Sequence, residues 1–127
     1  MRIENEELGM KNERKNVVLE KSFDFSLNVL KLYASLKEQK EYDLASQFLR
    51  SGTSIGANIE EAQGAQSKRD FISKMSISYK EARECRYWIR LFIESSVIDH
   101  ELLPVLLIEV TELCKLLSSI LQKSKAN

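Results

Sequence analysis

The sequence has little of what breaks or cross-links a chain. Its 127 residues include one proline, four glycines, two cysteines and one histidine. So few prolines and glycines exclude collagen-like and turn-rich architectures and favour long helices. Lysine plus arginine equals aspartate plus glutamate, at 19 each, so no overall charge draws the protein towards nucleic acid or an anionic membrane. Any such binding must come from a local patch.

Long apolar runs and targeting segments are also missing. The longest apolar stretch, residues 102–108, contains Pro104 and is far shorter than the roughly 20 residues of a membrane span. The charged start of the chain excludes a signal peptide. Cys85 and Cys114 lie far apart, each on an apolar helix line, so we interpret them as buried thiols in a reducing compartment rather than a disulfide or redox pair. We therefore expect a cytoplasmic protein that does not engage membranes.

What the sequence does have is helical periodicity. Residues 1–17 mix both charges with few apolar side chains and are predicted to form a disordered tail, whereas residues 18–127 form one domain. Apolar side chains recur every three or four positions in four segments, at about residues 19–39, 42–63, 67–95 and 99–123. Short connections force antiparallel neighbours, which predicts an all-α fold, an antiparallel up-down-up-down four-helix bundle.

Capping signals mark several helix ends. Ser67 and Asp70 have the spacing of a capping box at the start of the third segment. Asp99 is predicted to cap the fourth segment, and Gly64 lies just beyond the end of the second. The third segment then carries a continuous apolar seam, made of Phe71, Met75, Ser78, Ala82, Cys85, Ile89 and Phe92. The fourth segment carries a similar seam, made of Leu103, Leu106, Val110, Leu113, Leu117 and Ile120.

Two of the predicted helices are apolar on two faces. The first carries Phe23, Leu27, Leu30 and Ala34 on one stripe and a second stripe on the opposite side. One small bundle readily covers a single face, so we predict a homo-oligomer that hides the remainder. The alternative is that one chain encloses its first helix by itself. The predicted subunit-interface residues are Phe25, Val29, Leu32 and Leu36 on the first helix, and Ile77, Tyr87, Trp88 and Leu91 on the third.

The second predicted helix contains two glycines four residues apart, Gly52 and Gly56, each costing roughly 1 kcal/mol relative to alanine. Their shared face suits close packing of another helix, and the alternative is a groove for a ligand backbone. Asn58 nearby is unusual inside a helix. It either joins a buried polar network that fixes the helix register or is solvated.

The residues argue against an enzyme and against a cofactor or metal. The only histidine, His100, lies near a helix start, where such a residue is usually a plain surface group. A di-iron bundle needs paired Glu-x-x-His motifs, which are missing, and nucleophilic catalysis needs a base beside the nucleophile. Glu60 and Glu61 are adjacent and diverge by about 100° on a helix, so they make a poor acid/base pair.

Basic side chains are concentrated on the third predicted helix. Arg69, Arg83 and Arg90 share one ridge at heptad spacing, with Arg86 adjoining, and arginine ridges suit phosphate contacts. The alternative is a solvated face with local ion pairs, such as Asp70 with Lys74 and Arg90 with Glu94. These four arginines are the predicted nucleic-acid contacts.

One stretch resembles a known family. The segment SIGANIEE at residues 54–61, followed by the helix start at Ser67, Asp70, Phe71 and Ile72, is similar to the four-helix-bundle proteins of the 23S ribosomal-RNA intervening-sequence family. The resemblance implies an up-down bundle, often assembled as a ring-shaped homopentamer, without catalytic residues. Similar proteins that accompany diversity-generating retroelements are strongly basic, unlike this neutral chain.

Two hypotheses follow. The first is a non-enzymatic oligomer that binds RNA or a ribonucleoprotein, the partner class that the resemblance implies. The second is a protein-only scaffold without a nucleic-acid role, which would capture protein partners independently of salt.

Overall fold

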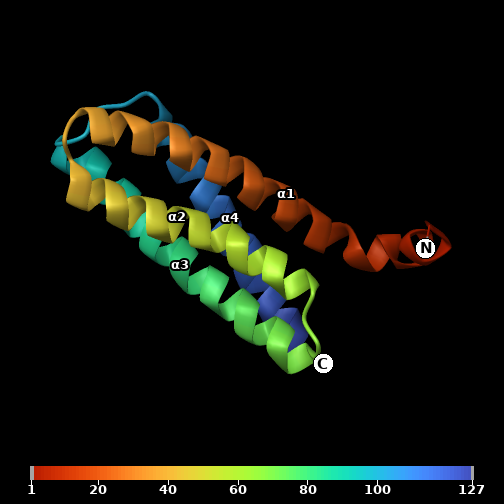
Figure 1. Cartoon of the computed structure of the whole chain (residues 1–127). Coiled ribbons are helices and arrows are strands. Elements are labelled where there is room, and N and C mark those ends of the chain that lie inside the picture. Colours follow the sequence, from red (N-terminus) through yellow and green to blue (C-terminus); the bar gives the residue numbers. More distant parts are fainter. Residues whose placement is uncertain (1, 127) are drawn as a thin grey trace.

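The structure, a computed structural model, describes the backbone of residues 2–126 and the side chains of residues 17–126. It contains four helices, α1 (Arg2–Glu38), α2 (Tyr42–Gln63), α3 (Lys68–Ser95) and α4 (Leu102–Ala126), and no strand within the described backbone. The helices run alternately up and down (Figure 1). α1 and α3 each contact both α2 and α4, so they occupy diagonal corners of the bundle. The predicted four-helix bundle is confirmed.

Helix bounds follow the apolar pattern most closely for α2 and α3. α4 begins three residues later than predicted and continues to Ala126. α1 begins at Arg2, and its first turns extend past the other helices (Figure 1). The disordered tail predicted for residues 1–17 falls almost wholly on residues whose side chains lie outside the described part, and it stays a prediction.

The turn from α1 to α2 is made without glycine. Lys40 adopts a left-handed backbone with φ 65°, and the Glu41 and Lys40 amides donate to the carbonyls of Leu36 and Lys37, both at 3.0 Å. This pair of bonds is a Schellman motif, which satisfies carbonyls that a helix end would leave unpaired. Three residues, 39–41, therefore suffice to connect α1 to the antiparallel α2.

The helix starts confirm one capping prediction and correct another. Ser67 caps α3 as predicted, since its side chain accepts a hydrogen bond from the Asp70 amide at 3.0 Å. The prediction of Asp99 as the cap of α4 is wrong. Instead, Nδ1 of His100 accepts a hydrogen bond from the Leu102 amide at 3.1 Å. The acceptor precedes the donor by two residues, the spacing of a short side-chain-to-backbone turn. His100 is thus half-buried and structural rather than a plain surface group.

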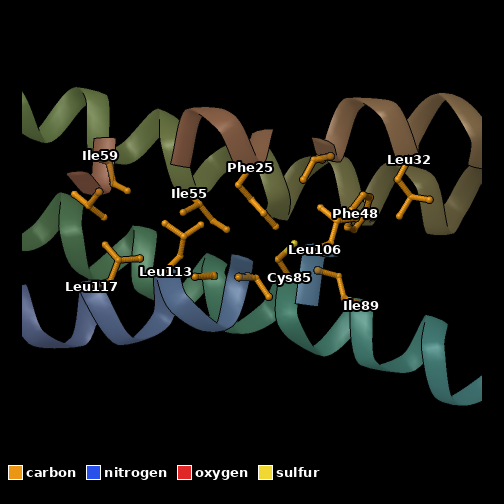
Figure 2. Close-up of a cluster of buried hydrophobic side chains, with 14 of the residues drawn as sticks. Phe25, Leu32, Phe48, Ile55, Ile59, Cys85, Ile89, Leu106, Leu113 and Leu117 are labelled. Carbon is orange, nitrogen blue, oxygen red and sulfur yellow. The ribbon is translucent and has the colours of Figure 1, made fainter. Parts of the chain in front are cut away.

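The interior corrects the assignment of faces on α1. Phe25, Val29, Leu32 and Leu36 were predicted to lie at a subunit interface, but all four have no exposed surface within one chain. Figure 2 shows Phe25 and Leu32 pointing into the core, where α2 contributes Phe48. Since the bundle needs one apolar stripe from every helix, this stripe serves the core.

The opposite stripe of α1 faces outward instead. Phe23, Leu27 and Leu30 are 61%, 46% and 47% exposed, and Ala34 is exposed beside them. The surplus apolar face of α1 is therefore present but lies on the other side of the helix. The predicted seams of α3 and α4 are buried except for the half-buried Phe71.

The glycines of α2 explain why α1 turns this face inward. A Cβ at Gly52 would lie 2.8 Å from Cγ2 of Val29, and a Cβ at Gly56 would lie 3.3 Å from Oγ of Ser26. Both glycines thus admit α1 closely, which confirms the packing interpretation. Asn58 acts locally, because its Nδ2 donates to the Ser54 carbonyl of the same helix at 2.8 Å.

This contact makes a prediction about Gly52. Gly52→Ala should lower the free energy of unfolding by about 1 kcal/mol, since overpacking against Val29 outweighs the gain in helix propensity. In a Val29→Ala background, where the clash is removed, the same substitution should stabilise the protein. Urea unfolding of the four proteins measures both effects.

Gly64→Ala is the matched control. Its added Cβ would meet nothing closer than 3.7 Å, and its φ of −99° suits any residue. This variant should change the unfolding free energy by less than about 0.5 kcal/mol. If Gly52→Ala stabilised both backgrounds equally, the close approach of α1 would be refuted.

Candidate nucleic-acid interface

A basic groove runs between α3 and α4. Its volume is about 350 Å³, and its lining contains four cationic side chains and no carboxylate. α3 contributes Tyr79, Arg83, Arg86, Tyr87 and Arg90, and α4 contributes Thr111, Cys114 and Lys115. The groove therefore combines positive charge with two phenol rings at the junction of two helices.

Contacts within the groove orient its arginines. Nε of Arg86 donates to Oγ1 of Thr111 at 3.0 Å, which ties α3 to α4 and leaves the outer guanidinium nitrogens free of any bond to the described residues. The guanidinium of Arg83 lies 5.9 Å from the ring centre of Tyr79, within the range of a cation–π contact. Arg90 is exposed. These arginines can donate paired N–H groups to phosphate oxygens.

Two acidic residues of α3, Glu81 and Glu84, are paired with α2 rather than with the groove arginines. Arg50 of α2 binds Glu81 at 3.0 Å and also binds Glu84. Lys74 does not form the local ion pair expected with Asp70, because it binds Glu61 of α2 at 2.9 Å. Among the described residues no ion pair joins Arg90 to Glu94, so the groove arginines keep their charge unpaired.

The positive charge of the groove acts on the pKa of a thiol that lines it. Partial burial raises the pKa of Cys114, while Arg86 and Arg83 oppose that rise. Cys85 lies in the core, where burial raises the pKa of its thiol to about 12. Both thiols are free, as predicted, but only Cys85 is buried, because Cys114 lies at the groove and is half-buried.

The groove contains most, but not all, of the predicted ridge. Arg83, Arg86 and Arg90 come together, whereas Arg69 lies 14 residues before Arg83, about 21 Å away along the helix, and does not line the groove. Sequence reasoning missed the contribution of α4. The only signal in the sequence was that Thr111 and Lys115 lie four residues apart, and so on one face of the helix, beside the apolar seam of α4.

The α3 residues predicted to form a subunit interface have mixed surroundings. Ile77 and Leu91 are 41% and 39% exposed, on the flank of α3 away from the groove. Trp88 is half-buried against the core, and Tyr87 opens onto the groove. Their role between subunits stays a prediction.

In the part of the chain whose side chains are described, residues 17–126, no three metal-ligating side chains converge. None of its helices combines the length and the apolar character that crossing a membrane would require.

The two thiols give a direct test of the groove. In the folded protein we expect an alkylating reagent to modify Cys114 and to leave Cys85 unmodified until the bundle unfolds. The thiolate is the reactive form, and a raised pKa means that the rate climbs as pH rises through and beyond 9. Arg86→Gln should slow the reaction, because it removes a charge that favours the thiolate.

Mass spectrometry of alkylated peptides against time measures both rates. The control is Arg69→Gln, which removes an equal charge outside the groove and should leave the Cys114 rate unchanged. Equal labelling of the two thiols in the native protein would contradict the assigned burial.

Comparison with known proteins places this fold in a family. Residues 14–119 match the family described as 23S rRNA-intervening sequence protein. A solved structure from Bacteroides thetaiotaomicron, a protein with unknown function from the S23 ribosomal protein family, is 47% identical with a TM-score of 0.80, over 86% of this chain and 98% of that chain. No curated protein matches the sequence significantly. Since the family match covers most of the chain, the protein belongs to the 23S rRNA-intervening sequence protein family.

Proposed function

We propose that this protein is a non-enzymatic, cytoplasmic oligomer that binds RNA through the groove between α3 and α4. The observation that carries the proposal is a lining of four cationic side chains without a carboxylate, in a chain of zero net charge. The family name, which refers to 23S rRNA, supports RNA as the polyanion.

The charge distribution favours a polyanion over a small acidic ligand. The groove is open along the bundle surface, and its cations extend from Arg83 to Arg90 on one wall with Lys115 on the other. Successive phosphates of one strand would meet successive cations, so each subunit would contribute a few contacts. Several subunits in one assembly would add their contacts through avidity.

Salt dependence tests this proposal. If four cations displace counterions from single-stranded RNA, a roughly fourfold rise in salt should weaken binding by about 50-fold for one groove. Arg83→Gln/Arg90→Gln should lower the affinity and flatten that dependence, because two fewer counterions are released. Fluorescence anisotropy of a labelled RNA across a salt series measures both quantities.

Lys68→Gln/Arg69→Gln is the matched control, because it removes the same charge from exposed positions of the same helix outside the groove. It should leave affinity and slope nearly unchanged. If the well-folded wild-type protein binds no RNA at low salt, RNA binding is excluded. If both double variants weaken binding equally, the groove is not the site.

The assembly itself is a second element of the proposal. The outward stripe of Phe23, Leu27 and Leu30 lies on α1, and the exposed Ile77 and Leu91 lie on α3 at the diagonal corner. Two different apolar patches that face apart favour head-to-tail contacts, which close into a ring when the rotation allows. This arrangement suits the homopentamer that the family resemblance implies.

Light scattering tests the assembly. We expect the wild-type protein to show a multiple of the subunit mass. Phe23→Glu should reduce that mass, because a carboxylate would have to be desolvated in the contact. Val97→Glu, at a 60% exposed position in the α3–α4 connection, is the control and should leave it unchanged. A monomeric wild-type protein would overturn the predicted assembly.

The same apolar patches favour a second candidate function, a scaffold that holds only proteins. It is distinguished by the RNA experiment: an intact oligomer that binds no RNA, yet captures a protein partner with little dependence on salt, fits the scaffold and not the RNA-binding protein.

A further inference from the structure

Tyr87 is held in an unusual position for an exposed aromatic residue. It is 53% exposed at the groove, and its ring packs edge-on against Trp88 at a centroid distance of 5.5 Å and an interplanar angle of 66°. This edge-to-face contact covers only the side of the phenol ring that faces Trp88. The exposed part of the phenol is thus left for a ligand in the groove.

A chain of polar contacts fixes the Trp88 ring. Nε1 of Trp88 donates to Oε2 of Glu84 at 3.1 Å, and the same carboxylate binds Arg50 of α2. The indole is therefore held at its polar end by Glu84, which Arg50 of α2 binds in turn, and it packs against the bundle core along its body. Tyr87 packs against this tryptophan, which is held by its hydrogen bond and by the core. The phenol therefore loses little conformational entropy when a ligand stacks on it.

The other phenol of the groove is differently occupied. Tyr79 is half-buried, and the guanidinium of Arg83 lies over its ring. Tyr79 and Tyr87 lie eight residues apart, about 12 Å along α3, with Arg83 between them. The groove thus offers one open ring beside a row of phosphate-binding cations.

We infer that the groove selects unpaired nucleotides, with a base stacked on Tyr87 and the flanking phosphates held by Arg83, Arg86 and Arg90. This inference rests on the RNA-binding function proposed above. Bases in a duplex are already stacked on one another and cannot reach a side-chain ring, whereas an unpaired base can. The cations alone would hold either form.

The experiment compares one RNA sequence in two forms, as an unstructured strand and as the paired stem of a hairpin. The wild-type protein should bind the unpaired strand more tightly. Tyr87→Leu should weaken strand binding by about 10-fold, the range of losing one base–aromatic stack, and change stem binding little. Tyr87→Phe retains the ring and should bind as the wild type does.

Tyr42→Leu is the matched control, because Tyr42 is 59% exposed at the start of α2, outside the groove. It should bind both RNA forms as the wild-type protein does. Trp88 gives an independent readout, since it is the only tryptophan in the chain and touches Tyr87. A base stacked beside it should change its fluorescence on addition of the strand and not of the stem.

The outcomes separate the two proposals. Equal binding of strand and stem, with Tyr87→Leu unchanged, would overturn the stacking role and leave RNA binding in place. No binding of either form by the wild-type protein would overturn both. A loss that Tyr87→Phe shares with Tyr87→Leu would also refute stacking, because the ring is then not what matters.

Discussion

The contact between Val29 and the bare backbone at Gly52 sets the rotation of α1, and much of the surface follows from that rotation. α1 has two apolar stripes, and only one can meet α2 where the glycines leave room. With Val29 seated there, Phe25, Leu32 and Leu36 complete the core. Phe23, Leu27 and Leu30 are then necessarily directed at solvent. A packing requirement inside one chain thereby creates an apolar face outside it.

The groove depends on α2 in a less direct way. Arg50 lies on α2 and lines no part of the groove, yet it binds two of the glutamates that α3 carries, Glu81 and Glu84. Through Glu84 it also anchors Trp88, against which Tyr87 packs. α2 therefore affects both of its neighbours. Its two glycines let α1 pack closely, and its Arg50 pairs with two acidic residues of α3.

The sequence predicts the four helices, the antiparallel order and the seams of α3 and α4, because apolar spacing reports helices directly. It does not choose between the two stripes of α1, since both repeat at heptad spacing. The residues that extend each stripe along the helix favour the correct one. The inner stripe continues through Ser22 and Val18, whereas the outer stripe continues through the charged Glu20 and Lys37.

The groove is only half predicted. Its arginines share one helix and can be found by counting, but Lys115, and the pairing of Glu81 and Glu84 with Arg50, depend on how neighbouring helices are rotated against each other. The same limit explains His100, whose capping bond depends on the path of a loop.

The double ion pair of Arg50 also means that the charge balance of α3 depends on a position outside the groove. Loss of this one guanidinium would remove one positive charge and leave both Glu81 and Glu84 without their ion pair on the helix that carries the groove arginines. A change at position 50 would therefore alter the charge balance of α3 while every groove residue stayed the same. Comparing groove sequences alone would miss that change, and position 50 would have to be read with them.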